Sequence, residues 1–354
     1  MKRFTAILLA LLFVMTMLSG CGQIGSNEKI SVVCTIFPQY DWVRQILGDK
    51  ADNMDLTLLL DNRIDLHNFQ PSVDDIVKIS SCDLFIYVGG ESDDWVDDAL
   101  KEATNKDMVV INLLEVLGDA AKIEEVKEGM EDGEGMEDKK GMEDEEDYHS
   151  DEDRDENHEY EGSHEDEYDH DEEHEVEYDE HVWLSLKNAQ IFCEAIADAL
   201  SALDAKGSDV YRSNLTAYID KLSALDSSYQ AVVNAAPVKT LLFGDRFPFR
   251  YLVDDYGMDY HAAFVGCSAE TEASFETIIF LAGKVDELSL KNIMATESSD
   301  QSITKTIRNN TAEKNQQILV MDAMQSVAKS DVQSGTTYLS IMENNLNVLK
   351  EALQ

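Results

Sequence analysis

Short apolar segments alternate with segments of helical periodicity along most of this chain, and this alternation is the feature that most restricts its fold. Runs of four to seven residues rich in β-branched and aromatic side chains predict strands. Apolar residues spaced three or four apart predict helices between them. This pattern is typical of α/β proteins with mainly parallel sheets. The predicted strands are Ile30–Ile36, Asp55–Leu60, Leu84–Val88, Met108–Asn112, Thr240–Phe243, Met258–Phe264, Asn292–Thr296 and Gln317–Met321.

One long helical segment divides these strands into two groups of four. Its periodicity runs from Val210 to Asn234, a break at Gly207 and Ser208 precedes it, and Pro237 ends it. We therefore predict two α/β lobes joined by one long, rigid helix. The N-terminal lobe is expected over residues 30–207, the connecting helix over 208–236 and the C-terminal lobe over 237–354. Further helices are predicted at Asp41–Leu47, at Val73–Ile79, from Leu186 onward, and at Thr337–Leu353.

An acidic insert of low complexity interrupts the first lobe between residues 119 and 180. Residues 123–180 contain 31 acidic and 4 basic side chains, so they carry most of the formal net charge of -44. The sequence Gly-Met-Glu-Asp occurs three times, from Gly129, Gly135 and Gly141. Few apolar residues are available for burial, which predicts that the insert is disordered. The strong negative charge also argues against nucleic acid as a partner.

The N-terminus has the features of a targeting signal. Lys2 and Arg3 precede an apolar run from Ala6 to Leu18, which is too short to span a membrane as a mature helix. The run ends in Leu-Ser-Gly-Cys, which resembles a bacterial lipobox with Cys21 as the lipidated residue. We expect residues 1–20 to be a signal peptide and 21–29 a lipidated tether. The mature protein would then be anchored at the extracellular face of the cell membrane.

The four remaining cysteines show no metal-binding spacing. Cys34, Cys82, Cys193 and Cys267 form no C-x-x-C pair, so a zinc ribbon is not predicted. The first three lie in apolar strand or helix patterns, where a cysteine usually acts as a small buried side chain. The sequence assigns no disulfide.

Candidate ligands follow from the positions of the predicted strands. In parallel α/β sheets, ligands are bound by loops just after the carboxyl ends of strands. Metal-binding side chains in such loops are His67, Asp245, Glu297 and Asp322, and His181 lies between the insert and the first long helix. His261 is a further candidate, but the alternation of side chains along its strand could turn it away.

The order of several motifs resembles the substrate-binding lipoproteins of bacterial zinc and manganese ABC importers, from about Val32 to Leu353. The motifs are VCTIFPQYDWV, HNFQPSVDDI with His67 and Pro71, CDLFIYVGGESDDWV, HVWLSLKNA with His181, FPFRYLVDDYGMDY, GCSAETEAS, MQSV and YLSIMENNL. The resemblance implies a metal in the cleft between two lobes, with His67, His181 and Asp322 among its ligands. It also implies an ABC permease and its ATPase subunit as partners, and we expect a monomer.

The third ligand that the family implies departs from its pattern here. This position falls on Gly244, which has no side chain to coordinate a metal. Asp245, His261 or Glu297 could replace it. His261 would favour zinc, whereas Asp245 or Glu297 would make manganese more plausible. We expect Zn²⁺, because nitrogen and oxygen sites generally bind zinc more tightly than manganese.

The insert is a second feature related to metals. His149, His158, His164, His170 and His174 lie among acidic residues at irregular intervals. One interpretation is a loose collector of zinc, since a polyanion concentrates cations and imidazoles give weak sites. The other is a solvated acidic loop without a role in binding.

Two other classes of function remain open. A zinc hydrolase could use two histidines and an aspartate, but the chain contains no H-E-x-x-H motif, and we predict that it is not an enzyme. A surface adhesin that displays the acidic tract is the other alternative. For a binding protein with a long connecting helix, we expect only limited motion between the lobes.

Overall fold

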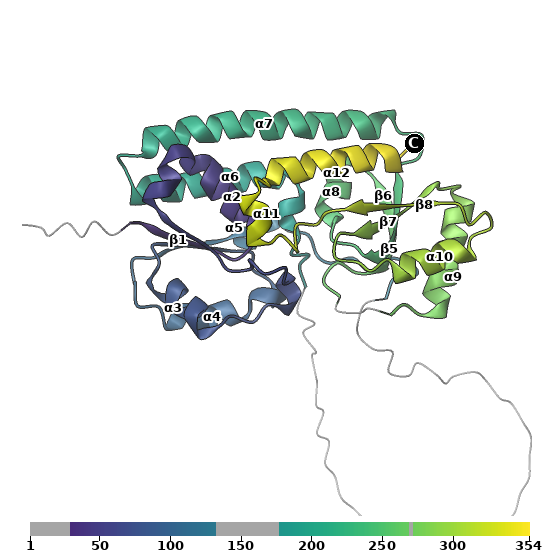
Figure 1. Cartoon of the computed structure of the whole chain (residues 1–354), viewed down its shortest axis with the longest axis horizontal. Coiled ribbons are helices and arrows are strands. Elements are labelled where there is room, and N and C mark those ends of the chain that lie inside the picture. Colours follow the sequence, from purple (N-terminus) through teal and green to yellow (C-terminus); the bar gives the residue numbers. More distant parts are fainter. Residues whose placement is uncertain (1–28, 132–176, 269–271) are drawn as a thin grey trace, which may run out of the picture.

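The two predicted lobes are both present in the structure, a computed structural model that describes residues 29–131, 177–268 and 272–354. Each lobe is a four-stranded parallel sheet with helices packed against it, and the lobes lie side by side (Figure 1). The prediction of an α/β fold with two lobes of mainly parallel sheet and a long helix between them is confirmed.

The first sheet has the strand order β2-β1-β3-β4. Its central strands are apolar throughout: the four residues of β3, Leu-Phe-Ile-Tyr, are all buried, as expected for a strand covered on both faces. Ser72 caps the start of helix α3: its hydroxyl accepts a hydrogen bond from the Asp75 backbone, and the Asp75 carboxylate accepts one from the Ser72 backbone. The elements are β1 (Ser31–Cys34), α2 (Phe37–Leu47), β2 (Asp55–Leu58), α3 (Val73–Ser81), β3 (Leu84–Tyr87), α4 (Trp95–Lys101), β4 (Val109–Asn112) and α5 (Leu113–Leu117).

The second sheet repeats this arrangement with the order β6-β5-β7-β8. Strand β5 is longer than predicted because it continues through Gly244 and Asp245 to Arg246, with a register shift against β6. The elements are β5 (Thr240–Arg246), α8 (Arg250–Tyr256), β6 (Asp259–Phe264), α9 (Phe275–Glu287), β7 (Asn292–Thr296), α10 (Ser302–Asn310) and β8 (Gln317–Met321).

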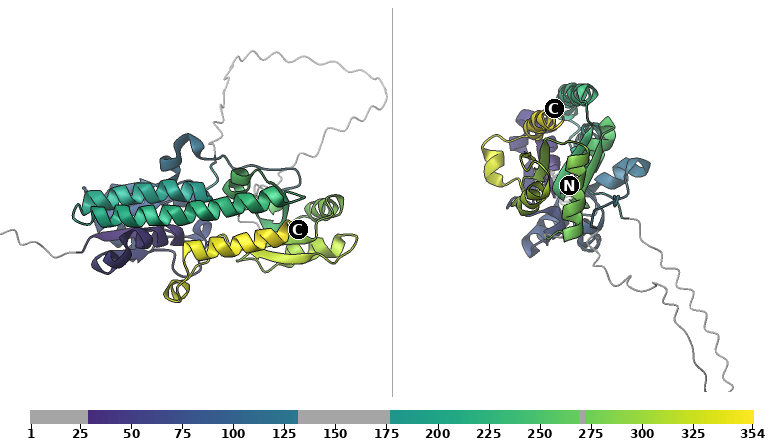
Figure 2. Two further views of the ribbon diagram at one scale, coloured as in Figure 1. Left: turned by 90° about the horizontal axis from the view of Figure 1, so that it is seen from above. Right: turned by 90° about the vertical axis from the view of Figure 1, so that its right-hand side faces the viewer.

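Helix α7 (Ser208–Ala235) and the segment after β8 connect the lobes. Helix α6 (Leu186–Leu203) packs against α7, and α7 extends over both lobes (Figure 2). After β8 the chain returns to the first lobe through α11 (Lys329–Gln333). Helix α12 (Tyr338–Ala352) then runs back beneath α7 toward the second lobe (Figure 1). The lobes are therefore joined both by α7 and by the returning segment that ends in α12.

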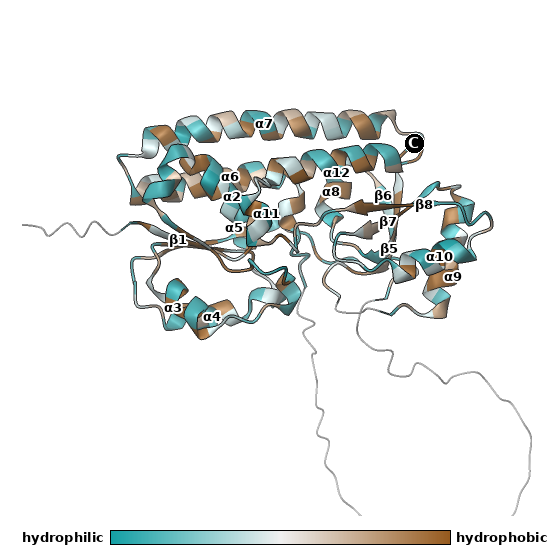
Figure 3. Cartoon of the chain, viewed as in Figure 1, coloured by the Kyte–Doolittle hydropathy of each residue, from teal (hydrophilic) through white to brown (hydrophobic). Residues whose placement is uncertain are grey.

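One hydrophobic core extends through both lobes. It includes Phe85 of β3, Tyr229 of α7 and Phe243 of β5, all fully buried. The apolar residues of α7 that the sequence predicts on one face are buried in this core. Apolar and polar residues alternate along the ribbon of this helix (Figure 3). A smaller cluster around Leu242, Leu281 and Ile307 lies within the second lobe. A shared apolar core favours lobes that move little relative to each other.

The two ends of the acidic insert depart from the predicted disorder. Residues 119–131 and 177–180 have defined positions, and Ile123 pairs with Tyr178 in an isolated antiparallel bridge. Lys122 forms an ion pair with Asp254, and Glu131 pairs with Phe264 at the end of β6. Charged residues at the ends of the insert thus contact residues of the second lobe. Composition alone does not predict these contacts. Residues 132–176 lie outside the described part of the chain.

Two findings bear on the cysteines and the membrane. Cys34, Cys82, Cys193 and Cys267 are all free thiols. Among the described residues, no helix has both the length and the apolar character needed to span a membrane.

Candidate metal centre

His67 lies in a short 3₁₀ turn, Leu66–Asn68, in the long loop after β2. Asp65 precedes this turn, and its Oδ1 accepts a hydrogen bond from the His67 backbone nitrogen at 3.1 Å. The side chain of His67 is only 7% exposed. Its Nδ1 lies 2.8 Å from the Ser92 hydroxyl and 3.4 Å from the Glu180 carboxylate. These partners fix the orientation of the ring and leave Nε2 as the ring atom available to bind a metal.

His181 begins the 3₁₀ turn Val182–Leu184 that leads into α6, and it is completely buried. The Asp179 carboxylate Oδ1 accepts hydrogen bonds from the His181 backbone at 2.8 Å and from the ring Nδ1 at 3.0 Å. A carboxylate bonded to one imidazole nitrogen holds the proton there and leaves the other nitrogen to bind a metal. Asp179 therefore makes Nε2 the available ligand atom of His181.

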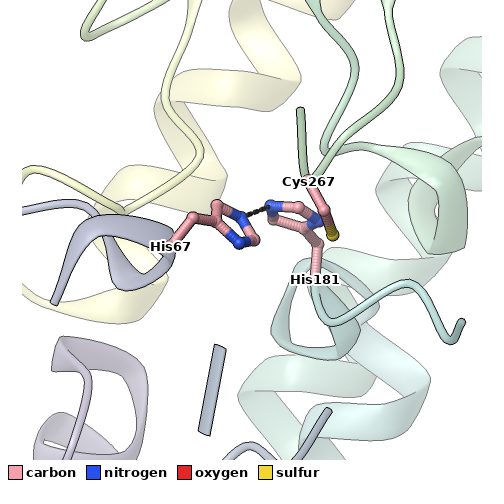
Figure 4. Close-up of side chains that lie close together, drawn as sticks. All are labelled: His67, His181 and Cys267. Carbon is pink, nitrogen blue, oxygen red and sulfur yellow. Dashed lines mark hydrogen bonds between the residues drawn. The ribbon is translucent and has the colours of Figure 1, made fainter. Parts of the chain in front are cut away.

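The Nε2 atoms of the two histidines face each other. Nε2 of His67 lies 3.2 Å from Nε2 of His181 (Figure 4). Burial, followed by the charge of the neighbouring His181, lowers the pKa of His67 to about 3, so its ring is neutral at physiological pH. Burial also favours a neutral His181, but the Asp179 carboxylate outweighs it and raises the pKa of His181 above its usual value. The pair is suited to share one cation.

Cys267 lies beside this pair. One ligand atom from each of His67, His181 and Cys267 falls within 4.8 Å of the other two, and the described residues contain no other such group of histidine, cysteine or carboxylate side chains (Figure 4). Burial, with the carboxylates of Asp179, Glu124 and Glu180, raises the pKa of the Cys267 thiol. We did not select Cys267 from the sequence. It lies in the loop after the predicted strand Met258–Phe264, however, so the rule for strand ends would have found it if cysteine had been included.

The candidates for the third ligand do not reach the histidine pair. Gly244 faces helix α10, since a Cβ added there would lie 2.6 Å from the Thr304 Cα. Asp245 accepts hydrogen bonds from the backbone and hydroxyl of Thr296, at 3.2 and 2.8 Å. His261 packs against Phe280, with ring centroids 6.0 Å apart, and its buried Nδ1 has no hydrogen-bond partner.

Glu297 and Asp322 lie at the ends of β7 and β8 and bind the loop that follows β8. Glu297 accepts hydrogen bonds from the backbone of Ala323 at 2.8 Å and of Gln325 at 3.1 Å. Asp322 accepts one from the Met324 backbone at 2.7 Å, and Met324 has a left-handed backbone with φ of 62°. Burial, then the nearby Asp322 charge, raises the pKa of Glu297 to about 7. Both carboxylates shape this loop.

The same loop and one arginine connect the two lobes at the site. The Gln325 amide nitrogen lies 3.1 Å from Nε2 of His181 and 3.3 Å from Asp65. Arg246 forms an ion pair with Asp65 at 2.7 Å and donates to the Ser268 carbonyl at 3.2 Å. Arg246 thus ties the loop of His67 to the loop of Cys267.

Several predicted residues fall outside the described residues. These are Cys21 and the five histidines of the insert, His149, His158, His164, His170 and His174.

Comparison with known proteins identifies the family. Residues 32–352 match the family described as Zinc-uptake complex component A periplasmic, or ZnuA. The chain belongs to the ZnuA family. The resemblance to substrate-binding proteins of metal importers is thereby confirmed.

Individual relatives of this ZnuA family member support the assignment. The zinc-binding lipoprotein AdcA of Streptococcus pneumoniae is 28% identical over 353 residues, covering 99% of this chain and 61% of that protein. The high-affinity zinc uptake system protein ZnuA of Bacillus subtilis is 28% identical over 327 residues, covering 92% and 88%. The crystal structure of the Zn(II)-bound ZnuA-like domain of S. pneumoniae AdcA is 25% identical with a TM-score of 0.64, covering 92% and 99%. The chain spans about three fifths of the length of the AdcA proteins that it matches.

Proposed function

We propose that this protein captures Zn²⁺ outside the cell at His67 and His181 and delivers it to an ABC importer. The proposal rests on the 3.2 Å separation of the two Nε2 atoms, in rings whose Nδ1 atoms are each held by a neighbouring side chain. A bound ion would replace the contacts that the two Nε2 atoms make with each other and with the Gln325 amide. Zinc binds imidazole at about 2.0–2.1 Å with tetrahedral angles, which places two such nitrogens about 3.3–3.4 Å apart. The pair therefore has nearly the spacing that one zinc ion requires. The zinc-binding and zinc-uptake names of the relatives agree with this cargo.

The ion is a transported substrate, and binding should be tight but reversible. Metal-stripped protein should bind one Zn²⁺ tightly, as measured by competition with a chromogenic chelator. His67→Ala and His181→Ala should each lower the affinity at least about a hundredfold, because each removes a ligand that no neighbour replaces. His261→Ala is the matched control and should bind as the wild type does. Tight one-to-one binding that survives both ligand substitutions would contradict the proposal.

Asp322 and Glu297 remain candidates for a further ligand. Asp322 lies on the loop that carries Gln325, and Gln325 contacts His181 directly. A modest shift of this loop would exchange the Gln325 amide for a carboxylate oxygen. Asp322→Asn should then weaken zinc binding less than loss of either histidine does.

The insert is proposed to collect zinc ahead of the site. His174 lies only seven residues before His181 in the sequence, so the collector and the site are joined directly. Because residues 119–131 and 177–180 contact the second lobe, the deletion that tests this idea should remove residues 132–176 only and replace them with a short Gly/Ser linker. The deletion should remove weak, multiple zinc sites and leave the tight one. Loss of the tight site would contradict the separation of the two roles.

Delivery requires a membrane partner. We propose an ABC permease with its ATPase subunit as the receiver, with the protein acting as a monomer that is lipid-anchored through Cys21 at the extracellular face. Labelling with a radioactive lipid precursor should mark the wild type and not Cys21→Ala.

A further inference from the structure

Cys267 is placed beside the histidine pair by the second lobe. The two histidines belong to segments attached to the first lobe, namely the loop after β2 and the turn before α6. Cys267 instead follows β6 of the second sheet. Its neighbourhood differs from that of the other cysteines: Cys34 lies within β1 and Cys193 within α6, both fully buried in the hydrophobic core. Of the cysteines in the described ranges, Cys267 is the one that adjoins histidine ligand atoms.

The loop of Cys267 is shaped for a close approach to His181. A Cβ on Gly266 would lie only 3.1 Å from the Cε1 and Nδ1 atoms of His181, and 3.0 Å from the Phe247 carbonyl. Glycine at this position therefore allows the backbone to lie against the imidazole ring. On the other side, the Cys267 backbone nitrogen donates to Glu124 at 2.9 Å, and Arg246 binds the next residue, Ser268. Contacts on both sides fix the loop that presents the thiol.

The other possible ligands of the second lobe are engaged elsewhere. Asp245 is bound by Thr296, and Glu297 is bound by the backbone of the 322–326 loop. His261 lies against Phe280. Among the histidine, cysteine and carboxylate side chains of the second lobe in the described residues, the Cys267 thiol is the one grouped with the two histidines.

The distances fit a shared ion after a small adjustment. A tetrahedral zinc with Zn–N of about 2.0–2.1 Å and Zn–S of about 2.3 Å separates nitrogen and sulfur by about 3.6 Å. One ring nitrogen of each histidine and the Cys267 sulfur lie within 4.8 Å of one another, at most roughly 1.2 Å beyond this separation. Rotation of the side chains or a slight approach of the lobes is sufficient to close that difference.

We propose that Cys267 coordinates the transported ion as a thiolate, so that the binding site is a His₂Cys centre assembled from both lobes. This inference rests on the proposed function of zinc capture. The thiol proton is released to solvent when the zinc–sulfur bond forms, so the step needs no oxidant or other reactant. A thiolate is a soft ligand that favours zinc over manganese, and Cys267 would therefore determine the selectivity of the site.

The test uses Co²⁺ as a spectroscopic substitute for zinc in the full-length protein. A cobalt–thiolate bond produces an intense sulfur-to-metal charge-transfer band in the near ultraviolet, whereas histidine and carboxylate ligands produce none. The wild type should develop this band until one equivalent of Co²⁺ is bound. Cys267→Ser should lack the band and bind zinc at least about tenfold more weakly. Cys193→Ser, a buried cysteine away from the site, is the matched control and should retain it.

A second variant tests metal selectivity, which would not change if Cys267 had only a structural role. Cys267→Asp replaces the soft ligand with a hard one, so its ratio of zinc to manganese affinity should fall at least about tenfold below the wild-type ratio. If one Co²⁺ binds tightly to the wild type without the charge-transfer band, the cysteine proposal is wrong and zinc capture still stands. A band that persists in Cys267→Ser would equally overturn it. Failure of the wild type to bind any ion tightly would instead contradict the proposed function itself.

Discussion

The residues around His181 make a prediction about affinity at the scale of a single side chain. Asp179 holds the His181 ring through Nδ1 at 3.0 Å. Asp179→Asn keeps the acceptor oxygen that orients the ring but removes the charge that favours a metal-bound imidazole. We expect zinc affinity at pH 7.5 to fall about 10- to 100-fold, as is usual when such a partner is lost. Chelator competition measures this effect, and Asp98→Asn, on the exposed surface of α4, is the control.

The same substitution should change the pH dependence of binding. Burial favours a neutral His181, but Asp179 raises its pKa, so protons compete with zinc more strongly in the wild type as the pH falls. Without this carboxylate the ring is protonated less readily. The difference in affinity between Asp179→Asn and the wild type should therefore narrow toward low pH. A constant difference would show that Asp179 acts only through the position of the ring.

Asp93 makes a separate prediction about folding stability. Its Oδ2 accepts hydrogen bonds from the backbone of Val88 and Gly89, whereas its buried Oδ1 has no partner. Burial raises the pKa of Asp93 from 3.8 to about 6. The folded protein thus holds this proton more tightly than the unfolded chain. The resulting stabilisation is complete below about pH 4 and is lost as the pH rises through 6, a change of roughly 3 kcal/mol.

Asp93→Asn tests this dependence, since the amide stays neutral and can still accept both backbone hydrogen bonds. The unfolding free energy of the variant, measured by urea titration, should exceed that of the wild type by more at pH 7.5 than at pH 4.5. Other buried carboxyls, such as Glu180, contribute equally to both proteins and cancel from the comparison. If the unfolding free energies of the variant and the wild type differ by the same amount at both pH values, titration of Asp93 does not contribute to the pH dependence of stability.

At the residue scale, the sequence indicated part of the site. His67 and His181 were selected from their positions beside a strand end and a helix start, and the structure brings them to 3.2 Å. The environment of Asp322 could not be predicted, because it depends on the left-handed backbone at Met324. Cys267 follows the end of a predicted strand, but cysteine was not among the ligand types considered there. Its distance from His181 depends on a tertiary contact at Gly266, between segments far apart in the sequence, and could not be predicted.

At the scale of elements, the local sequence was sufficient to predict most strands, but it predicted the first residues of helices and the ends of the insert less well. Strands β7 and β8 match the predicted ranges, since apolar runs between polar loops define them closely. Helix α2 begins at Phe37 rather than Asp41, because Pro38 is favourable in a first helical turn. The ordered ends of the insert were not predictable from composition, because their charges are balanced by partners such as Asp254 on the other lobe.

The packing of α7 against α12 gives a prediction at this scale. The hydroxyl of Tyr229 in α7 donates to the Met342 carbonyl in α12 at 2.7 Å, and both groups are buried. Tyr229→Phe leaves this carbonyl without its side-chain partner while keeping the aromatic ring, so the unfolding free energy should fall by about 1–2 kcal/mol. Chemical denaturation measures the change. Ser228→Ala on the exposed face of the same helix should alter stability by less than about 0.5 kcal/mol.

At the scale of the whole molecule, three features limit movement of the lobes. The hydrophobic core runs from β3 through α7 to β5 without interruption. The segment after β8 returns to the first lobe, where Asn62 pairs with Ala328. Arg246 joins the loops of His67 and Cys267 through Asp65 and the Ser268 carbonyl. A large hinge motion would have to break all three, whereas the adjustment needed for zinc coordination is roughly 1 Å.

We therefore expect zinc to change the distance between the lobes by no more than about 1 Å, as is usual for pre-organised binding surfaces. Spin labels on cysteines introduced at Val77 in α3 and Phe275 in α9, both exposed, report this distance by pulsed electron paramagnetic resonance. A pair at Val77 and Val110, both in the first lobe, is the control for label motion. A shift of the inter-lobe pair by several ångströms beyond that control would mean that the lobes close around the ion. Arg246→Met should broaden the inter-lobe distances in the metal-free protein, because it removes the guanidinium contacts with Asp65 and the Ser268 carbonyl that join the two ligand loops.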